Sequence, residues 1–256
     1  MIQERRRAAL VTGGSRGIGA STSLALAAHG YDMAFTYRNK QARADRVAAG
    51  ITSLGVRALP AQCDITHPNE MDALYGEIAE WSGALDALIL NASGGMERDL
   101  VAADSDYPMR INRDAQMKAL DGALPLMTDG GVVVFVTSHW AHLYGQVEQI
   151  PAYEPVAESK HAGEAALRAR IGELASRGIR LIVVTADLIE GTITPKLLER
   201  ISPGLEQDRR SALGPLPTAQ EMGQVIADAA VDHSLPSGQV IVIGAPLASL
   251  LTPDSE

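Results

Sequence analysis

Thr12-Gly13-Gly14-Ser15-Arg16-Gly17-Ile18-Gly19 is the segment that says most about the architecture of this chain. It follows an apolar run at 8–11 that predicts a strand, and it precedes a helical pattern at 20–28. A glycine-rich turn between a first strand and a first helix is a binding site for the phosphates of a dinucleotide. The residues that we predict to bind it here are Gly13, Ser15, Arg16, Gly17, Ile18 and Gly19.

Apolar runs rich in β-forming residues alternate with longer helical patterns along the chain. The expected strands are 8–12, 31–37, 56–61, 86–90, 131–137, 180–185 and 239–243. The expected helices are 17–29, 40–53, 68–81, 107–127, 156–177 and 218–231. Repeated strand–helix–strand order implies a parallel sheet that helices cover on both faces. We therefore predict an α/β fold, with one doubly wound Rossmann-type domain and a seven-stranded parallel sheet spanning residues 1–256.

One stretch, 187–217, does not fit the alternation. It is rich in proline and glycine, and it is too long for a simple connection between a strand and a helix. Ligands of open parallel sheets bind beyond the carboxyl ends of the strands. This irregular stretch is therefore a candidate lid over the substrate.

Composition excludes several classes of function. The net charge of −9 argues against binding to nucleic acid or to an anionic membrane surface. No run approaches the ~20 apolar residues of a membrane span. The single cysteine excludes an internal disulfide, and His139, His142 and His161 have no spacing that suggests a metal site. We expect a cytoplasmic protein, with Arg5-Arg6-Arg7 as a solvated lead-in to the first strand.

The residues after the second strand indicate which dinucleotide binds. NAD enzymes usually carry Asp or Glu there, to hold the ribose hydroxyls. This chain has Tyr37-Arg38-Asn39, and Asp32 lies at the wrong end of the strand to reach the ribose. Arg38 and Arg16 can instead pair with a 2′-phosphate through charge-assisted hydrogen bonds. The expected cofactor is therefore NADPH or NADP⁺.

Six motifs resemble those of the short-chain dehydrogenase/reductase superfamily. They are Thr12 to Gly19, Cys63-Asp64-Ile65, Asn91-Ala92, Ile111-Asn112, Thr137-Ser138 and Ser159-Lys160. The resemblance implies that Asp64 faces the adenine and that Asn91 and Ala92 line the cofactor channel. Ile65 belongs to the adenine motif. Thr192 is a further candidate for contact with the cofactor, although the chain lacks the Pro-Gly that usually precedes this threonine.

The same resemblance implies four catalytic residues. Asn112 would hold a helix kink and a water of the proton relay, and Ser138 would orient the substrate carbonyl. Lys160 would bind the nicotinamide ribose and lower the pKa of a tyrosine that donates the proton. The usual spacing, Tyr-x-x-x-Lys, places that tyrosine at Val156, which cannot donate. The nearest tyrosine is Tyr153, seven residues before the lysine and on the same helical face.

The Tyr-x6-Lys arrangement is similar to that of enoyl-acyl-carrier-protein reductases, a branch of the same superfamily. Reducing a conjugated C=C leaves the enolate oxygen three bonds from the hydride acceptor, which suits a donor one helical turn back. We therefore favour hydride transfer from NADPH to a conjugated enoyl or enone substrate. The alternatives are a ketone reductase that uses Tyr153, and a catalytically silent NADP(H)-binding protein. His142 or Tyr144 could supply the proton if Tyr153 does not.

The partners implied are a small-molecule or acyl substrate and further copies of the chain. Members of the family usually form dimers or tetramers through the helices that correspond to 107–127 and 156–177. Small residues in the second helix permit close helix contact; they are Ala157, Ala162, Gly163, Ala165 and Ala166. A homodimer or homotetramer is the expectation.

Overall fold

The computed structural model describes residues 5–251, apart from the side chains of residues 212 and 213. Its centre is one parallel sheet in the order β3-β2-β1-β4-β5-β6-β7. The strands are β1 (Ala8–Val11), β2 (Asp32–Tyr37), β3 (Ala58–Gln62), β4 (Leu85–Leu90), β5 (Met127–Ser138), β6 (Arg180–Ala186) and β7 (Val240–Ile243). The strand order reverses between β1 and β4, which share a register that pairs Leu10 with Leu88. Such a reversal opens a crevice at the carboxyl ends of the strands.

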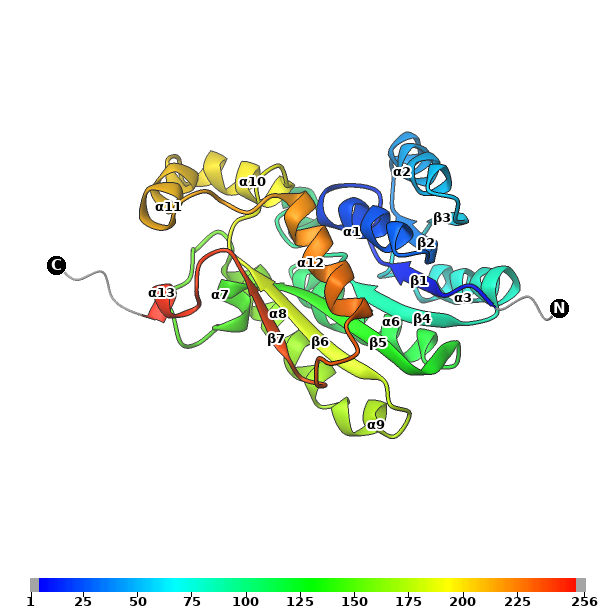
Figure 1. The fold of residues 1–256 in the computed structure, drawn as a ribbon. Coiled ribbons are helices and arrows are strands. Elements are labelled where there is room, and N and C mark those ends of the chain that lie inside the picture. The colour runs from blue at the N-terminus through cyan, green and yellow to red at the C-terminus, as the bar shows by residue number, and fades with distance from the viewer. Residues whose placement is uncertain (1–4, 252–256) are drawn as a thin grey trace.

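Helices cover both faces of the sheet, as the alternating pattern predicted (Figure 1). One layer holds α1 (Gly17–Ala28), α2 (Gln41–Ser53) and α12 (Ala219–Val231). The other holds α3 (Pro68–Ser82), α6 (Ala115–Ala123), α8 (Glu154–Arg168) and α9 (Ile171–Ala175). Together with the sheet order, these layers confirm the predicted doubly wound α/β domain. No helix within residues 5–251 is long and apolar enough to cross a membrane.

The strands form because the sheet is buried on both faces. Val133 and Phe135 of β5 pack into the layer of α3, α6 and α8, while Val134 and Val136 pack against α1 and α12. Continuous apolar runs of this kind are typical of parallel strands. Each fully buried large apolar side chain contributes roughly 1.5–3 kcal/mol to the free energy of folding, so the sheet is a rigid base for the loops at its edge.

Two predicted helices were wrong in their limits. The segment 107–127 is not one helix: α5 (Tyr107–Met109) is followed by a π-helical turn, η1 (Arg110–Asp114), then by α6, and β5 already begins at Met127. The segment 156–177 divides into α8 and α9. Helix α8 begins two residues earlier than expected because Pro155 is accommodated in its first turn, where no hydrogen-bond donor is needed.

The segment 187–217 is also more regular than expected. It contains α10 (Ile193–Ile201) and α11 (Leu205–Leu213), which Figure 1 shows beyond the carboxyl-terminal edge of the sheet. Its prolines and glycines lie near helix ends: Pro195 lies in the first turn of α10, and Gly204, with φ of +95°, precedes α11. Ion pairs from Arg209 to Asp187 and from Arg210 to Glu190 connect α11 to the segment that follows β6.

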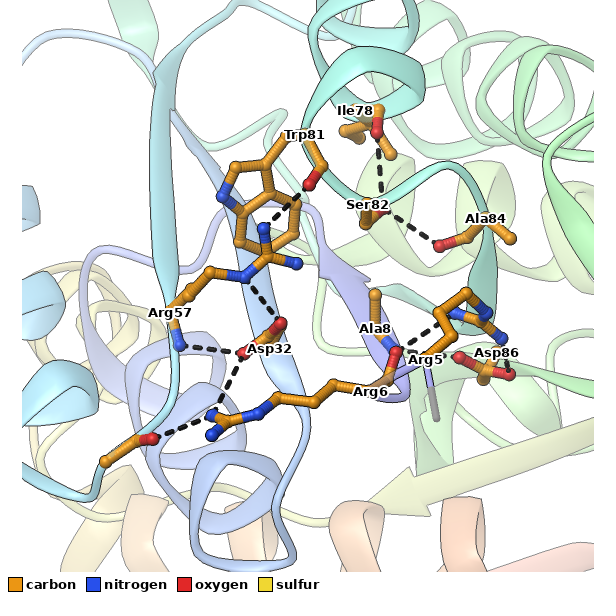
Figure 2. Close-up of polar contacts among 11 residues, drawn as sticks. Arg5, Arg6, Ala8, Asp32, Arg57, Ile78, Trp81, Ser82, Ala84 and Asp86 are labelled. Atoms are coloured by element: carbon orange, nitrogen blue, oxygen red, sulfur yellow. Dashed lines mark hydrogen bonds and ion pairs between the residues drawn. The ribbon is translucent and has the colours of Figure 1, made fainter. Parts of the chain in front are cut away.

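Figure 2 shows the opposite, amino-terminal edge of the sheet. Asp32 is fully buried there, and its carboxylate accepts hydrogen bonds from the backbone and the side chain of Arg57 at 2.8 and 2.7 Å. Asp32 therefore lies far from any ribose site, as the sequence indicated. Arg5 and Arg6 are exposed, as expected of a solvated lead-in, and they also pair with Asp86 and Asp32 respectively.

Candidate functional site

The glycine loop between β1 and α1 has the conformation that close approach of a ligand requires. Gly13 and Gly17 have φ of +70° and +52°, which glycine adopts without strain. A Cβ atom at Gly19 would lie 2.4 Å from the carbonyl oxygen of Gly13, so only glycine fits there. A Cβ atom at Gly17 would be in ordinary van der Waals contact with the Thr192 side chain, 3.8 Å away. No side chain caps α1, so its first N–H groups are available to an anion.

Asn91 fastens this loop to the end of β4. Its side-chain amide donates hydrogen bonds to the carbonyl oxygens of Thr12 and Gly13, at 2.9 and 3.3 Å. In return, the Thr12 hydroxyl accepts from the backbone N–H groups of Asn91 and Ala92. These contacts place Asn91 and Ala92 beside the loop, where the sequence predicted them. Ser15 and Ile18 are half-buried in the same loop.

Arg16 and Arg38 lie close enough for their charges to interact. Burial lowers the pKa of the Arg16 guanidinium, and the positive charges of Arg43 and Arg38 lower it further. The Tyr107 hydroxyl accepts a hydrogen bond of 3.1 Å from Arg38. Sequence reasoning missed Arg43 and Tyr107. Arg43 lies in the first turn of α2 and could have been found from its spacing to Arg38, whereas nothing in the sequence linked Tyr107 to this place.

Asp64 and Ile65 follow β3 with different surroundings. The Asp64 carboxylate accepts hydrogen bonds from the backbone and hydroxyl of Thr66, at 3.0 and 2.7 Å, and this turn leaves Asp64 half-buried at the edge of the sheet. The side chain of Ile65 is instead buried in the core against α3. Of the pair, only Asp64 is therefore partly accessible to a ligand.

Ser138 and Tyr153 meet at the end of β5. The Tyr153 hydroxyl donates a hydrogen bond of 3.0 Å to the Ser138 hydroxyl oxygen. The tyrosine ring packs edge-on against Trp140, with 6.4 Å between ring centroids. Burial raises the pKa of the Tyr153 phenol, and the hydrogen bond to Ser138 partly offsets this. The phenol is therefore protonated at neutral pH, as a proton donor must be.

A pocket of about 120 Å³ opens over this pair. The predicted residues that line it are Ile18, Asn91, Ser138, Tyr153, Lys160 and Thr192. Apolar side chains that sequence reasoning missed complete the wall; they are Trp140, Leu188, Ile189 and Leu198. They come from α7 (His139–His142) and from the segment after β6, where the sequence pattern carried no sign of which residues turn inward.

Lys160 lies on α8 with its side chain almost fully buried. Burial lowers the pKa of its ammonium group to about 8. The nitrogen is 5.9 Å from the ring centroid of Phe135, and no hydrogen bond to it occurs within the described residues. A buried ammonium group at the wall of a pocket favours a ligand with acceptor oxygens, such as ribose hydroxyls.

Asn112 lies in the π-helical turn η1 and faces away from solvent. Its amide nitrogen donates hydrogen bonds to the Gly94 carbonyl and to the Ser159 hydroxyl, at 2.9 and 3.0 Å. Its amide oxygen accepts from the Ser93 hydroxyl at 2.8 Å. The side chain thus connects the segment after β4 with α8 next to Lys160. The kink is present, and the role of Asn112 in a proton relay stays a prediction.

Gly163 allows α8 to pack directly on η1. A Cβ atom at this position would lie 2.2 Å from the carbonyl oxygen of Asn112. We expect Gly163→Ala to lower the free energy of unfolding by about 1–3 kcal/mol, because backbone must move to make room. Urea unfolding measures this. Gly172→Ala is the matched control, since nothing lies within 4 Å of a Cβ atom there, and an equal loss in both variants would contradict the packing argument.

No group of three or more His, Cys, Asp and Glu side chains that could hold a metal ion occurs in the part of the chain that the structure describes. Cys63 is buried, and burial together with the nearby carboxylate of Glu70 raises the pKa of its thiol to about 12. This cysteine is therefore a packed, unreactive side chain.

Comparison with known proteins identifies the family of the chain. Residues 7–201 match the family model described as short chain dehydrogenase, and the chain belongs to that family. It is an oxidoreductase of the short-chain type.

Two curated relatives and one solved structure illustrate the range of the family. The chain is 29% identical to 1-cyclohexenylcarbonyl-CoA reductase of Streptomyces collinus over 73% of this chain and 66% of that protein. It is 28% identical to a hydroxynaphthalene reductase of Aspergillus fumigatus over 98% of this chain and 87% of that one. A short chain dehydrogenase from Burkholderia cenocepacia, crystallised with NADP, has a TM-score of 0.82 and 29% identity, covering 94% and 98% of the two chains.

Proposed function

We propose that this protein is an NADPH-dependent reductase of a ketone, in which Ser138 and Tyr153 bind the oxygen of the substrate. The contact of 3.0 Å between the two hydroxyl groups carries the proposal. Two hydroxyl donors that meet at one point can both hydrogen-bond to a single carbonyl oxygen placed there. The apolar wall formed by Trp140 and Leu188 suits the carbon skeleton of such a substrate.

The residues present fit a bound NADPH. The glycine loop offers the positive-φ backbone at Gly17 and a helix N-terminus without a side-chain cap for the pyrophosphate. Arg16 and Arg38 would hold the 2′-phosphate, with Arg43 close by. Lys160 would hydrogen-bond to the nicotinamide ribose, and Asn91, Ala92, Thr192 and Asp64 would line the channel. The solved neighbour from Burkholderia cenocepacia that contains NADP supports this assignment.

When bound, NADPH supplies the hydride for the reduction. Tyr153 donates its phenolic proton to the substrate oxygen as negative charge develops there. Ser138 donates a second hydrogen bond to the same oxygen and holds it beside the phenol. The ammonium of Lys160 at the same pocket wall stabilises the phenolate that proton donation leaves behind. Asn112 braces α8 behind the lysine through Ser159.

The position of the Tyr153 hydroxyl is the reason that we favour a ketone substrate over the enoyl substrate expected from the sequence. The sequence favoured an enoyl or enone because the tyrosine stands one helical turn early. In the structure this displacement along the chain does not separate the hydroxyl from Ser138, since Tyr153 immediately precedes α8 and its side chain reaches the serine. A donor next to the serine suits proton delivery to the oxygen of the carbonyl that accepts the hydride.

Reduction of a conjugated enoyl or enone is the second candidate. Val156 is buried at the position where the family usually has tyrosine, so no phenol is available at that spacing to donate a proton to a ketone oxygen. The Streptomyces collinus relative is named for a substrate whose C=C bond is conjugated to a thioester carbonyl. In this reaction Ser138 and Tyr153 would bind the enolate oxygen instead of the ketone oxygen.

Incubation with NADPH and a matched pair of substrates, a cyclic ketone and the corresponding enone, separates the two candidates. We expect the saturated ketone to give the alcohol, and the enone to keep its C=C bond. Saturated ketone as the product of the enone would contradict the ketone proposal and support the second candidate. No oxidation of NADPH with any carbonyl substrate would favour a silent cofactor-binding protein.

Removal of the Ser138 hydroxyl tests whether Ser138 binds the oxygen of the substrate. We expect Ser138→Ala to lower kcat for ketone reduction about 10²-fold, because one donor to the developing oxyanion is lost. Steady-state kinetics with NADPH measure this. Ser82→Ala is the control, because Ser82 lies at the opposite edge of the sheet and its hydroxyl contacts only backbone carbonyls (Figure 2). A kcat that both variants leave unchanged would remove Ser138 from the mechanism.

Self-association and a cytoplasmic location remain part of the proposal. Of the small residues in α8, Ala157 and Gly163 are buried within the chain, and Gly163 packs on η1. Their small size is therefore explained by packing within a single copy of the chain. Ala165 is exposed and stays available for a second copy, so a homodimer or homotetramer through α6 and α8 is still expected.

A further inference from the structure

The serine of the site depends on a very short helix. Ser138 is the N-cap of α7, a helix of four residues, and its hydroxyl oxygen accepts a hydrogen bond of 3.2 Å from the backbone N–H of Ala141. One turn of helix does not hold itself together in water. The orientation of the Ser138 hydroxyl toward Tyr153 therefore depends on side chains that fasten α7 to its neighbours.

Histidines provide two of these fastenings. The Nε2 atom of His139 lies 2.9 Å from the carbonyl oxygen of Ala245, and its Nδ1 lies 3.0 Å from the Thr185 hydroxyl. The Nδ1 atom of His161, on α8, lies 3.0 Å from the carbonyl oxygen of Ala141. Because carbonyl oxygens only accept, the facing ring nitrogens carry the protons. These contacts hold the beginning and the middle of α7.

The end of α7 is held by a buried carboxylate. The Nδ1 atom of His142 lies 2.9 and 3.0 Å from the two oxygens of Glu164, which is on α8 one turn after Lys160. The Glu164 side chain is only 6% exposed. Burial opposes its ionisation, but hydrogen bonds from His142 and Arg168 outweigh burial and lower the pKa of the carboxyl. Glu164 is therefore a buried charge whose partners are on two different helices.

We propose that His142 and Glu164 are a positioning pair: they fasten α7 to α8 and thereby hold the Ser138 hydroxyl against Tyr153. The pair acts through α7 and not on the substrate. The effect of this pair on catalysis depends on the proposed role of Ser138. Its effect on the position of α7 does not depend on that role, so the two effects can be measured separately.

Trp140 makes the position of α7 measurable without any substrate. It lies on α7, buried against Tyr153 and under the guanidinium of Arg209 at 5.1 Å. The chain has one other tryptophan, Trp81, which contacts Arg57 at the far edge of the sheet. In a Trp81→Phe background, the emission of Trp140 reports on its helix alone.

The test compares two variants that each remove one partner of the same carboxylate. His142→Ala breaks the contact with α7. Arg168→Gln breaks contacts that do not involve α7: Arg168 Nε donates to Glu164 within α8 at 2.8 Å, and its Nη1 donates to the Gly238 carbonyl at 3.2 Å. We expect His142→Ala to shift the Trp140 emission to longer wavelength and to increase its quenching by acrylamide. Arg168→Gln should leave both unchanged. Equal emission spectra in the two variants would overturn the positioning role.

Kinetics provide the second readout. We expect His142→Ala to lower kcat about 10- to 100-fold through misplacement of Ser138, with the Kd of NADPH unchanged. His142→Gln, whose amide can still donate to Glu164, should recover most of the lost kcat and the original emission. A kcat equal to that of Arg168→Gln would mean that the contact is merely structural. If Ser138→Ala itself leaves kcat unchanged, the proposed function fails, while the emission test still decides where α7 is held.

Discussion

Replacement of Tyr153 by phenylalanine is expected to lower kcat for NADPH-dependent reduction by about 10²- to 10⁴-fold, the usual contribution of a general acid. The Kd of NADPH should not change, because the glycine loop and the arginines are separate from the phenol. The ring of phenylalanine keeps the edge contact with Trp140, so the fold is expected to remain intact. Steady-state kinetics and a fluorescence titration with NADPH measure the two quantities.

Tyr144→Phe is the matched control for this prediction. Tyr144 stood as an alternative proton source, but its ring contacts His161 at 5.9 Å and it is not among the residues of the pocket that holds Ser138. The other alternative, His142, already directs its Nδ1 atom to Glu164. Loss of kcat in Tyr144→Phe, with Tyr153→Phe active, would transfer the role of proton donor and contradict the assignment.

Cofactor preference should depend on the arginines beside the glycine loop. We expect the double variant Arg16→Ser/Arg38→Ser to weaken binding of NADPH about 100-fold while changing binding of NADH little. The loss of two charge-assisted hydrogen bonds to the 2′-phosphate, at about 1.5 kcal/mol each on this exposed surface, gives that ratio. Titrations with NADPH and NADH measure it.

Arg46→Ser is a suitable control, since Arg46 is exposed on α2 and is not among the arginines whose charges act on Arg16. Competition with 2′,5′-ADP and 5′-AMP measures the contribution of the 2′-phosphate to binding, because the two nucleotides differ only in that group. The double variant should lose its preference for 2′,5′-ADP. If it binds NADPH and NADH each as tightly as the unaltered chain does, a 2′-phosphate site at Arg16 and Arg38 is excluded.

Much of the fold could be predicted because its signals are local. The apolar runs of β1, β4 and β6 and the glycine loop each specify their structure within a few residues. Only the family resemblance indicated a kink at Asn112; the local pattern did not predict the π-helical turn η1, because the turn depends on Asn112 bonding to Gly94 and Ser159, which are distant in sequence. The helices α10 and α11 were missed because prolines and glycines mark helix ends as well as loops.

The sequence indicated candidate side chains for the site, but it could not indicate their geometry. The motif around Ser138 and Lys160 indicated which side chains to examine. Whether the Tyr153 hydroxyl reaches Ser138 depends on where α8 begins, and the sequence Glu154-Pro155 left that open. The contact between His142 and Glu164 could not be predicted from the sequence, because the two residues are 22 positions apart and lie on different helices.

A crystal structure of the protein with NADP⁺ and an unreactive ketone analogue tests the central claim most directly. The account predicts the ketone oxygen within about 2.6–3.2 Å of both the Tyr153 and the Ser138 hydroxyl oxygens. It also predicts the Lys160 ammonium on the nicotinamide ribose. A ketone oxygen bound elsewhere, with the Tyr153 hydroxyl turned away from the nicotinamide, would contradict the proposed oxygen site even if the cofactor lies in the glycine loop.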